Sequence, residues 1–105
     1  MDVVHLSGPS GSGKTTRLVE LIRTAVAEGR SVGAIKHTHH PLNTENRGDT
    51  AAFLVAGARP VILAGDGEAV IFDGTSAVRV SYSERAELLA RLTNDLVVIE
   101  GFKDA

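Results

Sequence analysis

The chain of 105 residues contains no cysteine, so it forms neither disulfides nor metal sites built on thiolates. An excess of basic charge is also missing, because the formal net charge is -2 at pH 7. Proteins that bind nucleic-acid phosphates or anionic membrane surfaces through charge need such an excess. The composition therefore argues against a nucleic-acid partner and against an electrostatic membrane anchor.

Long apolar runs are absent as well. The stretch before the first Gly/Ser run is short and includes His5, so we expect no secretory signal. No run approaches the roughly 20 apolar residues that cross a bilayer. Hydrophobic residues make up 43% of the chain, which is enough for one packed core but not for two. We expect a single domain over residues 1–105 with a cytoplasmic location and no membrane partner.

Short apolar runs alternate with helical patterns along the chain. Strands are predicted at 3–6, 31–36, 60–64 and 96–99, and a hairpin at 69–72 and 77–80 turns at Asp73-Gly74. Helices are predicted from Lys14 to a cap at Gly29, over 49–58, and over 85–92 after a capping box at Ser81 and Glu84. This order indicates an α/β fold with a mostly parallel central sheet flanked by helices. Because the chain ends soon after the last apolar run, we expect that strand, or a neighbouring one, to form an exposed edge and to self-associate.

The segment from Gly8 to Thr15 fits G-x-x-x-x-G-K-[ST], the Walker A phosphate-binding motif, at every fixed position. It follows a predicted strand and opens a predicted helix, as phosphate binding through backbone N–H groups requires. Lys14 is expected to bridge the β- and γ-phosphates of a nucleoside triphosphate, and the Thr15 hydroxyl to bind magnesium. Thr16 is expected to pack or cap in the first turn, with phosphate contact as the alternative. The predicted nucleotide site comprises Gly8, Pro9, Ser10, Gly11, Ser12, Gly13, Lys14, Thr15 and Thr16.

Proteins with this loop hold the magnesium shell with an acidic residue at a strand end. Glu100 ends the apolar run 96–99, whereas Asp95 precedes it. Ligands bind beyond the carboxyl ends of strands in open α/β sheets. We therefore predict that Glu100 is the metal-side acid and that Asp95 is a solvated residue at the opposite end of the sheet.

Lys36, His37, His39 and His40 follow the second predicted strand, on the same rim as the phosphate loop. Three readings stay open for them: contact with phosphate, water or a partner, a transition-metal site, or a solvated loop without a role. Asp49 has two readings of equal weight, a helix N-cap or a second carboxylate beside magnesium or the attacking water.

The chain resembles the molybdopterin-guanine dinucleotide biosynthesis adapter family (MobB). The resemblance is carried by GPSGSGKTT at 8–16, VGAIKHTHH at 32–40, GDTAAFLVAGA at 48–58 and DLVVIEGFK at 95–103. It implies a P-loop NTPase-like fold and GTP binding with magnesium. Lys14, Thr15 and Glu100 match the phosphate, magnesium and strand-end positions, and His37, Asp49 and Lys103 fall within family motifs.

The resemblance also implies weak GTP hydrolysis, homodimers, and a partner guanylyltransferase that attaches guanosine monophosphate to molybdopterin, with molybdopterin itself as a further partner. Members continue past the EGFK stretch, and guanine recognition is expected from that continuation. Two alternatives stay open: a nickel-delivery GTPase, suggested by the histidines, and a small nucleotide-dependent kinase, disfavoured by scattered arginines.

Overall fold

The computed structural model describes residues 1–7, 13–39, 42 and 48–102. In these residues the elements occur in the order β1 (Asp2–Leu6), α1 (Lys14–Ala27), β2 (Val32–His37), α2 (Gly48–Ala56), β3 (Val61–Ala64), β4 (Glu68–Phe72), β5 (Ala77–Ser81), α3 (Arg85–Leu89) and β6 (Leu96–Glu100). The predicted strand and helix types are confirmed throughout, and most boundaries differ by one or two residues.

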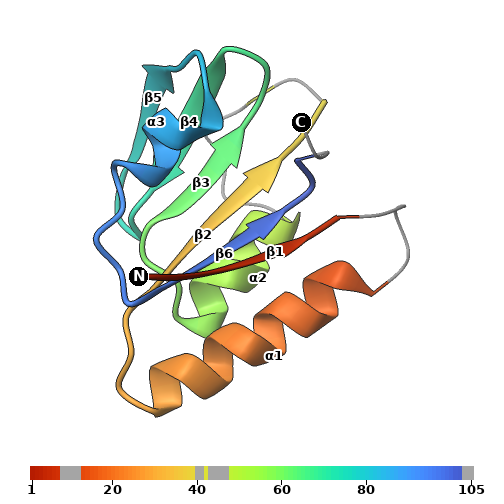
Figure 1. Cartoon of the computed structure of the whole chain (residues 1–105), viewed down its shortest axis with the longest axis vertical. Coiled ribbons are helices and arrows are strands. Elements are labelled where there is room, and N and C mark those ends of the chain that lie inside the picture. Colours follow the sequence, from red (N-terminus) through yellow and green to blue (C-terminus); the bar gives the residue numbers. More distant parts are fainter. Residues whose placement is uncertain (8–12, 40–41, 43–47, 103–105) are drawn as a thin grey trace.

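The six strands form one sheet in the order β1-β6-β2-β3-β4-β5. The pairs β1–β6, β6–β2 and β2–β3 are parallel, whereas β3–β4 and β4–β5 are antiparallel. The predicted turn at Asp73-Gly74 joins β4 to β5, and Gly74 adopts a φ of 103°. A mostly parallel sheet that continues into a hairpin is therefore confirmed (Figure 1).

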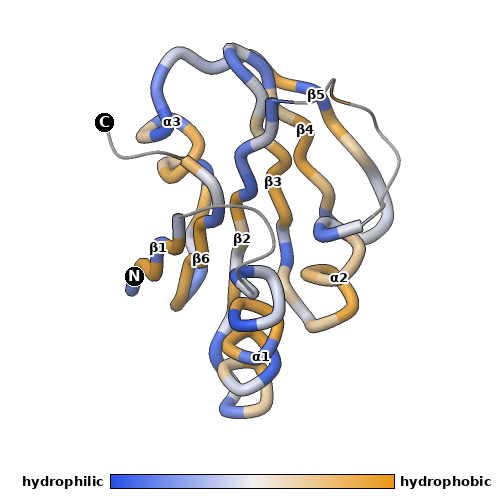
Figure 2. The backbone as a smooth tube through the Cα atoms, turned by 90° about the vertical axis from the view of Figure 1, so that its right-hand side faces the viewer, coloured by the Kyte–Doolittle hydropathy of each residue, from blue (hydrophilic) through white to orange (hydrophobic). Residues whose placement is uncertain are grey.

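Helices cover the sheet on both faces, with α1 and α2 on one side and α3 on the other (Figure 2). Strand β6 shows why this is possible, since all five of its residues are buried. Its alternate side chains, Leu96 and Val98 on one face and Val97 and Ile99 on the other, join two separate apolar cores. A continuous apolar run is typical of a parallel strand buried on both faces.

The expectation of an exposed last strand is wrong. β6 pairs with β1 on one side and β2 on the other, so it lies inside the sheet. The edges of the described sheet are β1 and β5. Sequence order placed β6 last, but the crossover from α3 inserts it between the first two strands, so β6 has no free edge for self-association. The alternative, self-association through a neighbouring strand, stays a prediction, because β1 pairs with β6 and is an edge of the described sheet.

The third helix also differs from the prediction. It ends at Leu89 rather than at residue 92, and the capping box at its start lies three residues later than predicted. The Glu87 carboxylate accepts a hydrogen bond of 2.9 Å from the Glu84 N–H, so Glu84 and Glu87 form the capping pair instead of Ser81 and Glu84. Both pairs have the same three-residue spacing, which is why the sequence alone did not separate them.

Candidate functional site

The carboxyl ends of the parallel strands meet at one rim of the sheet. Glu100 ends β6, and the register places it beside Leu6 of β1 and Lys36 of β2. Helix α1 begins at Lys14, just after β1 leaves this rim. Open α/β sheets bind ligands at this rim, and the charged side chains of the protein's central strands gather there.

Thr15, in the first turn of α1, contacts the strand-end acid directly. Its hydroxyl donates a hydrogen bond of 2.9 Å to Oε1 of Glu100, across 85 positions of sequence. Glu100 is only 3% exposed, and it is one of two buried polar or charged residues in the described chain. A buried carboxylate persists only when it is paired and hydrogen-bonded. The two residues predicted to bind magnesium are thus brought together.

Lys36 provides the opposite charge for Glu100. Its Nζ lies 2.5 Å from Glu100 Oε2 and 2.7 Å from Asp49 Oδ2. Burial by itself lowers the pKa of Lys36, but the hydrogen bonds and charges of Asp49 and Glu100 outweigh burial, so the net pKa is raised above 10.5. The ammonium group is therefore permanently charged at neutral pH and links β2, β6 and α2 through side chains.

Asp49 lies within the first turn of α2, which begins at Gly48. Its carboxylate contacts Lys36, so the structure places it in the cluster at the rim rather than at the cap position before the helix. A negative charge in the first helical turn is also favourable toward the helix dipole. We refer to Thr15, Lys36, Asp49 and Glu100 as the rim cluster.

The charges of the rim cluster fit a divalent cation. Two carboxylates and one ammonium group give a formal charge of -1, and the Thr15 hydroxyl and Glu100 carboxylate present adjacent oxygen atoms. Magnesium prefers oxygen ligands and is commonly held by one or two protein groups plus phosphate oxygens and water. The donor set therefore suits magnesium better than a soft transition metal.

Within the predicted phosphate loop, Gly8, Pro9, Ser10, Gly11 and Ser12 lie outside the described residues, and Lys103 does also. Gly13 precedes α1 with a φ of 84°, a left-handed conformation that glycine adopts without a Cβ penalty. Lys14 is half-buried at the start of the helix, whereas Thr16 is exposed. The exposure of Thr16 argues against packing, whereas capping by Thr16 and phosphate contact by these residues stay predictions.

His37 faces away from the rim cluster. Because side chains alternate along a strand, Lys36 points toward α2 and His37 toward the α3 side. There its ring stacks on Phe102 at 4.5 Å between centroids, and its Nε2 lies 3.2 Å from Asp66 Oδ1. These residues line a cavity of about 690 Å³ together with Tyr82 and Arg85. His37 and Glu100 thus belong to two different surfaces of the same rim.

The remaining candidates have structural partners. Asp95 is exposed at the opposite end of β6, as predicted. Its carboxylate accepts a hydrogen bond of 2.9 Å from the Ser31 N–H. His5 is half-buried, and its Nε2 lies 2.9 Å from the carbonyl oxygen of Phe102. His39 is exposed beside Asp66, and His40 lies outside the described residues.

Two features of this rim were missed by reasoning from the sequence. Lys36 was considered as a phosphate contact, but its ion pairs with two carboxylates depend on strand order. Asp66 received no role, although it follows β3 at the same rim. A search for every acidic residue just after a predicted parallel strand would have found it.

The chain is similar to known proteins over nearly its whole length. Residues 3–105 match the family described as "Molybdopterin guanine dinucleotide synthesis protein B". The molybdopterin-guanine dinucleotide biosynthesis adapter protein of Haemophilus influenzae is 40% identical over 102 residues, which are 96% of this chain and 57% of that protein. The adapter protein of the same name from Escherichia coli is 34% identical over 96 residues, which are 90% of this chain and 55% of that protein.

The crystal structure of Bacillus subtilis MobB shares the fold, with a TM-score of 0.56 and 24% sequence identity, and the match covers 100% of this chain and 63% of that one. The predicted P-loop NTPase-like α/β class is therefore confirmed. The chain spans a little over half the length of the curated relatives that it matches. Among the described helices, none is long and apolar enough to cross a membrane.

Proposed function

Because this chain belongs to the molybdopterin guanine dinucleotide synthesis protein B family, we propose that it binds GTP with magnesium and acts as an adapter in molybdopterin-guanine dinucleotide synthesis. Its proposed partners are the guanylyltransferase of that pathway and molybdopterin. The proposal extends to a homodimer in the cytoplasm.

The observation that supports nucleotide binding most strongly is the hydrogen bond of 2.9 Å between the Thr15 hydroxyl and Glu100. A Walker A hydroxyl and a strand-end carboxylate are the two protein groups that hold magnesium in P-loop nucleotide sites. Here they come from opposite ends of the chain and meet at the start of α1. If the Walker A match were accidental, there would be no reason for the Thr15 hydroxyl to contact a strand-end carboxylate.

Thr15 and Glu100 would hold the magnesium ion, which would neutralise charge on the β- and γ-phosphates. Lys36 would balance the charge of Glu100 and fix its orientation through Oε2, so that Oε1 faces Thr15. Asp49 would hold Lys36 in place from α2. Gly13 lets the backbone turn into α1, and the first N–H groups of a helix attract phosphate oxygens.

The same contacts support slow hydrolysis. Both carboxylates of the rim cluster are already engaged by Lys36, so neither is placed as a general base that is ready to accept a proton from water. Without such a base, and without an added arginine, P-loop proteins of this class turn over slowly. We propose a protein whose bound GTP sets its adapter state and is hydrolysed only slowly.

Calorimetric titration of the purified chain with magnesium-GTP and magnesium-ATP tests this proposal. We expect GTP to bind, and Lys14→Ala to abolish binding, because Lys14 is the predicted phosphate contact. Asp95→Asn, at the opposite end of the sheet, is the matched control and should bind as the unmodified chain does. Absence of binding to either nucleotide would reject the proposal, whereas equal binding of both would retain the phosphate site and reject guanine selection.

Single-turnover hydrolysis separates a slow GTPase from a protein that only binds. GTP that stays intact over many hours would remove the hydrolytic part of the proposal while leaving the binding part. Fast hydrolysis without any partner would contradict the inference that neither carboxylate of the rim cluster acts as a general base.

A further inference from the structure

We propose that His37, His39 and Asp66 form a binding site for a divalent transition-metal ion, with Zn²⁺ as the ion that the ligands suit best. One ligand atom from each of the three side chains lies within 4.8 Å of the other two. Two imidazole nitrogens and one carboxylate oxygen are ligands that zinc accepts readily. The site lies on the α3 side of the rim and is separate from the rim cluster.

His37 is held in place before any metal binds. Its side chain is only 11% exposed, and its ring is fixed between Phe102, stacked at 4.5 Å, and His39, edge-on at 4.8 Å. Nε2 is the ring atom that faces Asp66. Groups that fix the orientation of a ligating histidine raise metal affinity, because the ring need not be ordered on binding.

The turn that carries Asp66 is held from several sides. The Gly65 N–H donates to the Glu68 carbonyl at 2.8 Å, and the Tyr82 N–H donates to the Gly67 carbonyl at 3.0 Å. The Tyr82 hydroxyl also donates to the carbonyl oxygen of Gly65. These contacts tie the β3–β4 turn to the segment before α3, so the backbone of Asp66 has a defined position, while its side chain is 80% exposed and accessible to an ion.

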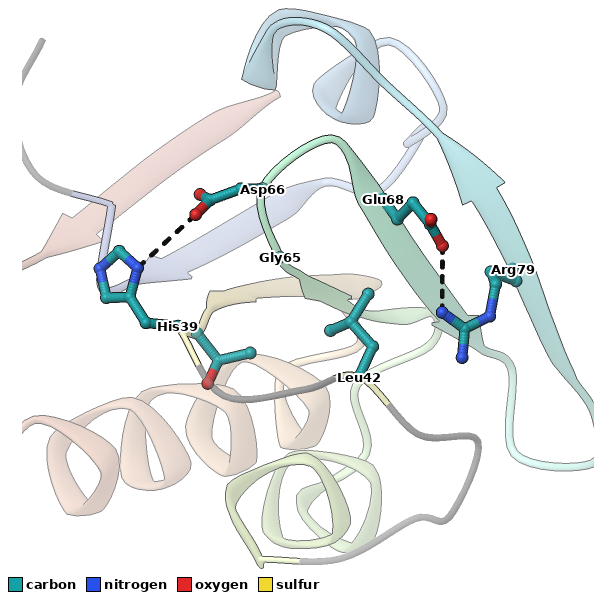
Figure 3. A pocket seen from close by; sticks show the side chains of 7 residues that line it. His39, Leu42, Gly65, Asp66, Glu68 and Arg79 are labelled. Atoms are coloured by element: carbon teal, nitrogen blue, oxygen red, sulfur yellow. Dashed lines mark hydrogen bonds and ion pairs between the residues drawn. The ribbon is translucent and has the colours of Figure 1, made fainter.

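The third ligand comes from the end of β2. The Thr38 N–H donates to the Ala64 carbonyl at 2.8 Å, which holds the chain after β2 against the end of β3. His39 Nδ1 then lies 3.9 Å from Asp66 Oδ2, and Figure 3 shows the two side chains directed at one another. The His39 side chain is 72% exposed, so a rotation of its ring meets little resistance.

The separations are close to those of a metal site. Ligands about 2.0–2.1 Å from a tetrahedral zinc ion are about 3.3 Å from each other. His37 Nε2 and Asp66 Oδ1 are 3.2 Å apart, which is close to that separation, and all three ligand atoms lie within 4.8 Å of one another. Rotation of the exposed His39 and Asp66 side chains would aim the ligand atoms at one ion. Three protein ligands leave one position open toward the cavity lined by Tyr82, Arg85 and Phe102, as in zinc sites that bind a further ligand.

The two faces of the rim therefore select different ions. The rim cluster offers oxygen atoms, which magnesium prefers, whereas His37 and His39 offer imidazole nitrogens, which favour zinc, nickel or copper. A plain pair of histidine–aspartate contacts would explain the same distances without a metal. Direct measurement of metal binding distinguishes these two possibilities.

The test is calorimetric titration of the tag-free, nucleotide-free chain with Zn²⁺, followed by Co²⁺ titration monitored by visible absorption. We expect one ion per chain, with Co²⁺ bands of a four-coordinate site. Asp66→Asn and His39→Ala should each weaken Zn²⁺ affinity by at least about tenfold, since even loss of an outer partner of a ligand costs this much. Glu68→Gln is the matched control, because Glu68 lies beside the site but pairs with Arg79 at 3.0 Å.

Absence of Zn²⁺ binding, or equal affinity in Asp66→Asn and the unmodified chain, would overturn the proposal. Equal weakening in Glu68→Gln would also overturn it, because general loss of surface charge would then explain the effect. Histidine ¹⁵N chemical shifts supply an independent readout, since metal binding must move the ring signals of His37 and His39. Magnesium-GTP binding by Asp66→Asn is measured alongside, and it should be unchanged.

Discussion

Replacing Lys36 with methionine tests how much the ion pairs of the rim cluster stabilise the fold. The ammonium group lies 2.5 Å from Glu100 and 2.7 Å from Asp49, and the side-chain exposures are 22% for Lys36, 4% for Glu100 and 36% for Asp49. Methionine keeps the length and apolar stem of lysine but removes the charge. A carboxylate buried in the sheet then loses its counter-charge, with a second carboxylate nearby.

The two ion pairs contribute unequally. Breaking a buried pair by removing one partner costs about 3–5 kcal/mol, and the partial exposure of Lys36 reduces that cost for its pair with Glu100. The pair with Asp49 is closer to a surface pair, worth about 0.2–1 kcal/mol. We therefore expect Lys36→Met to lower the free energy of unfolding by about 2–4 kcal/mol.

The pH dependence follows from the raised pKa of Lys36. Because the folded-state pKa lies above the unfolded value of 10.5, the stabilisation is fully present below pH 10.5 and is lost as the pH rises through the folded-state pKa. Neutral pH is thus the condition in which the variant differs most from the unmodified chain. In alkaline solution above this range the two should converge.

Urea unfolding followed by far-ultraviolet circular dichroism measures the difference, with Arg79→Met as the control. Arg79 pairs with Glu68 on the exposed hairpin at 3.0 Å, so its loss should cost less than about 1 kcal/mol. Magnesium should restore part of the stability of Lys36→Met, because a cation that binds only the folded state adds stability. A Lys36→Met variant within about 0.5 kcal/mol of the unmodified chain would refute this reasoning.

Further predictions concern the backbone around the site and the hairpin. Asp73→Ala should destabilise the β4–β5 turn, because backbone and hydroxyl donors of that turn hold the pKa of Asp73 well below 3.8. In the unmodified chain this stabilisation is present above pH 3.8 and is lost as the pH falls below that value. Urea unfolding of both proteins over a series of acidic pH values measures the difference. Gly101→Ala should cost more than Gly29→Ala in urea unfolding. Both glycines have positive φ, worth about 1–2 kcal/mol of strain, but only at Gly101 would the added Cβ also lie 2.9 Å from the His37 carbonyl oxygen.

Local patterns accounted for most of the fold. Short apolar runs predicted all six strands, and the 3- and 4-residue spacing predicted α1 because its buried residues Leu18, Ile22 and Ala25 lie on one face. The turn at Asp73-Gly74 followed from glycine chemistry. These signals lie within a few consecutive residues, so a single sequence contains them.

Strand order is not a local signal, and this explains the main error. The position of β6 between β1 and β2 depends on how the chain crosses over the sheet after α3. The same order decides that Lys36 and Glu100 lie side by side. Glu100 was predicted from its place at a strand end, but its pairing with Lys36, and the meeting of His37 with Asp66, required the three-dimensional arrangement.

The most direct test of the account is the effect of magnesium on GTP affinity, compared between the unmodified chain and Glu100→Gln. Glutamine preserves the shape of the side chain and can still accept a hydrogen bond from Thr15, but it removes the charge that would hold the ion. We expect magnesium to strengthen GTP binding to the unmodified chain and to have little effect on Glu100→Gln. An equal effect of magnesium on both proteins would show that the Thr15–Glu100 pair does not hold the ion, and would contradict the account.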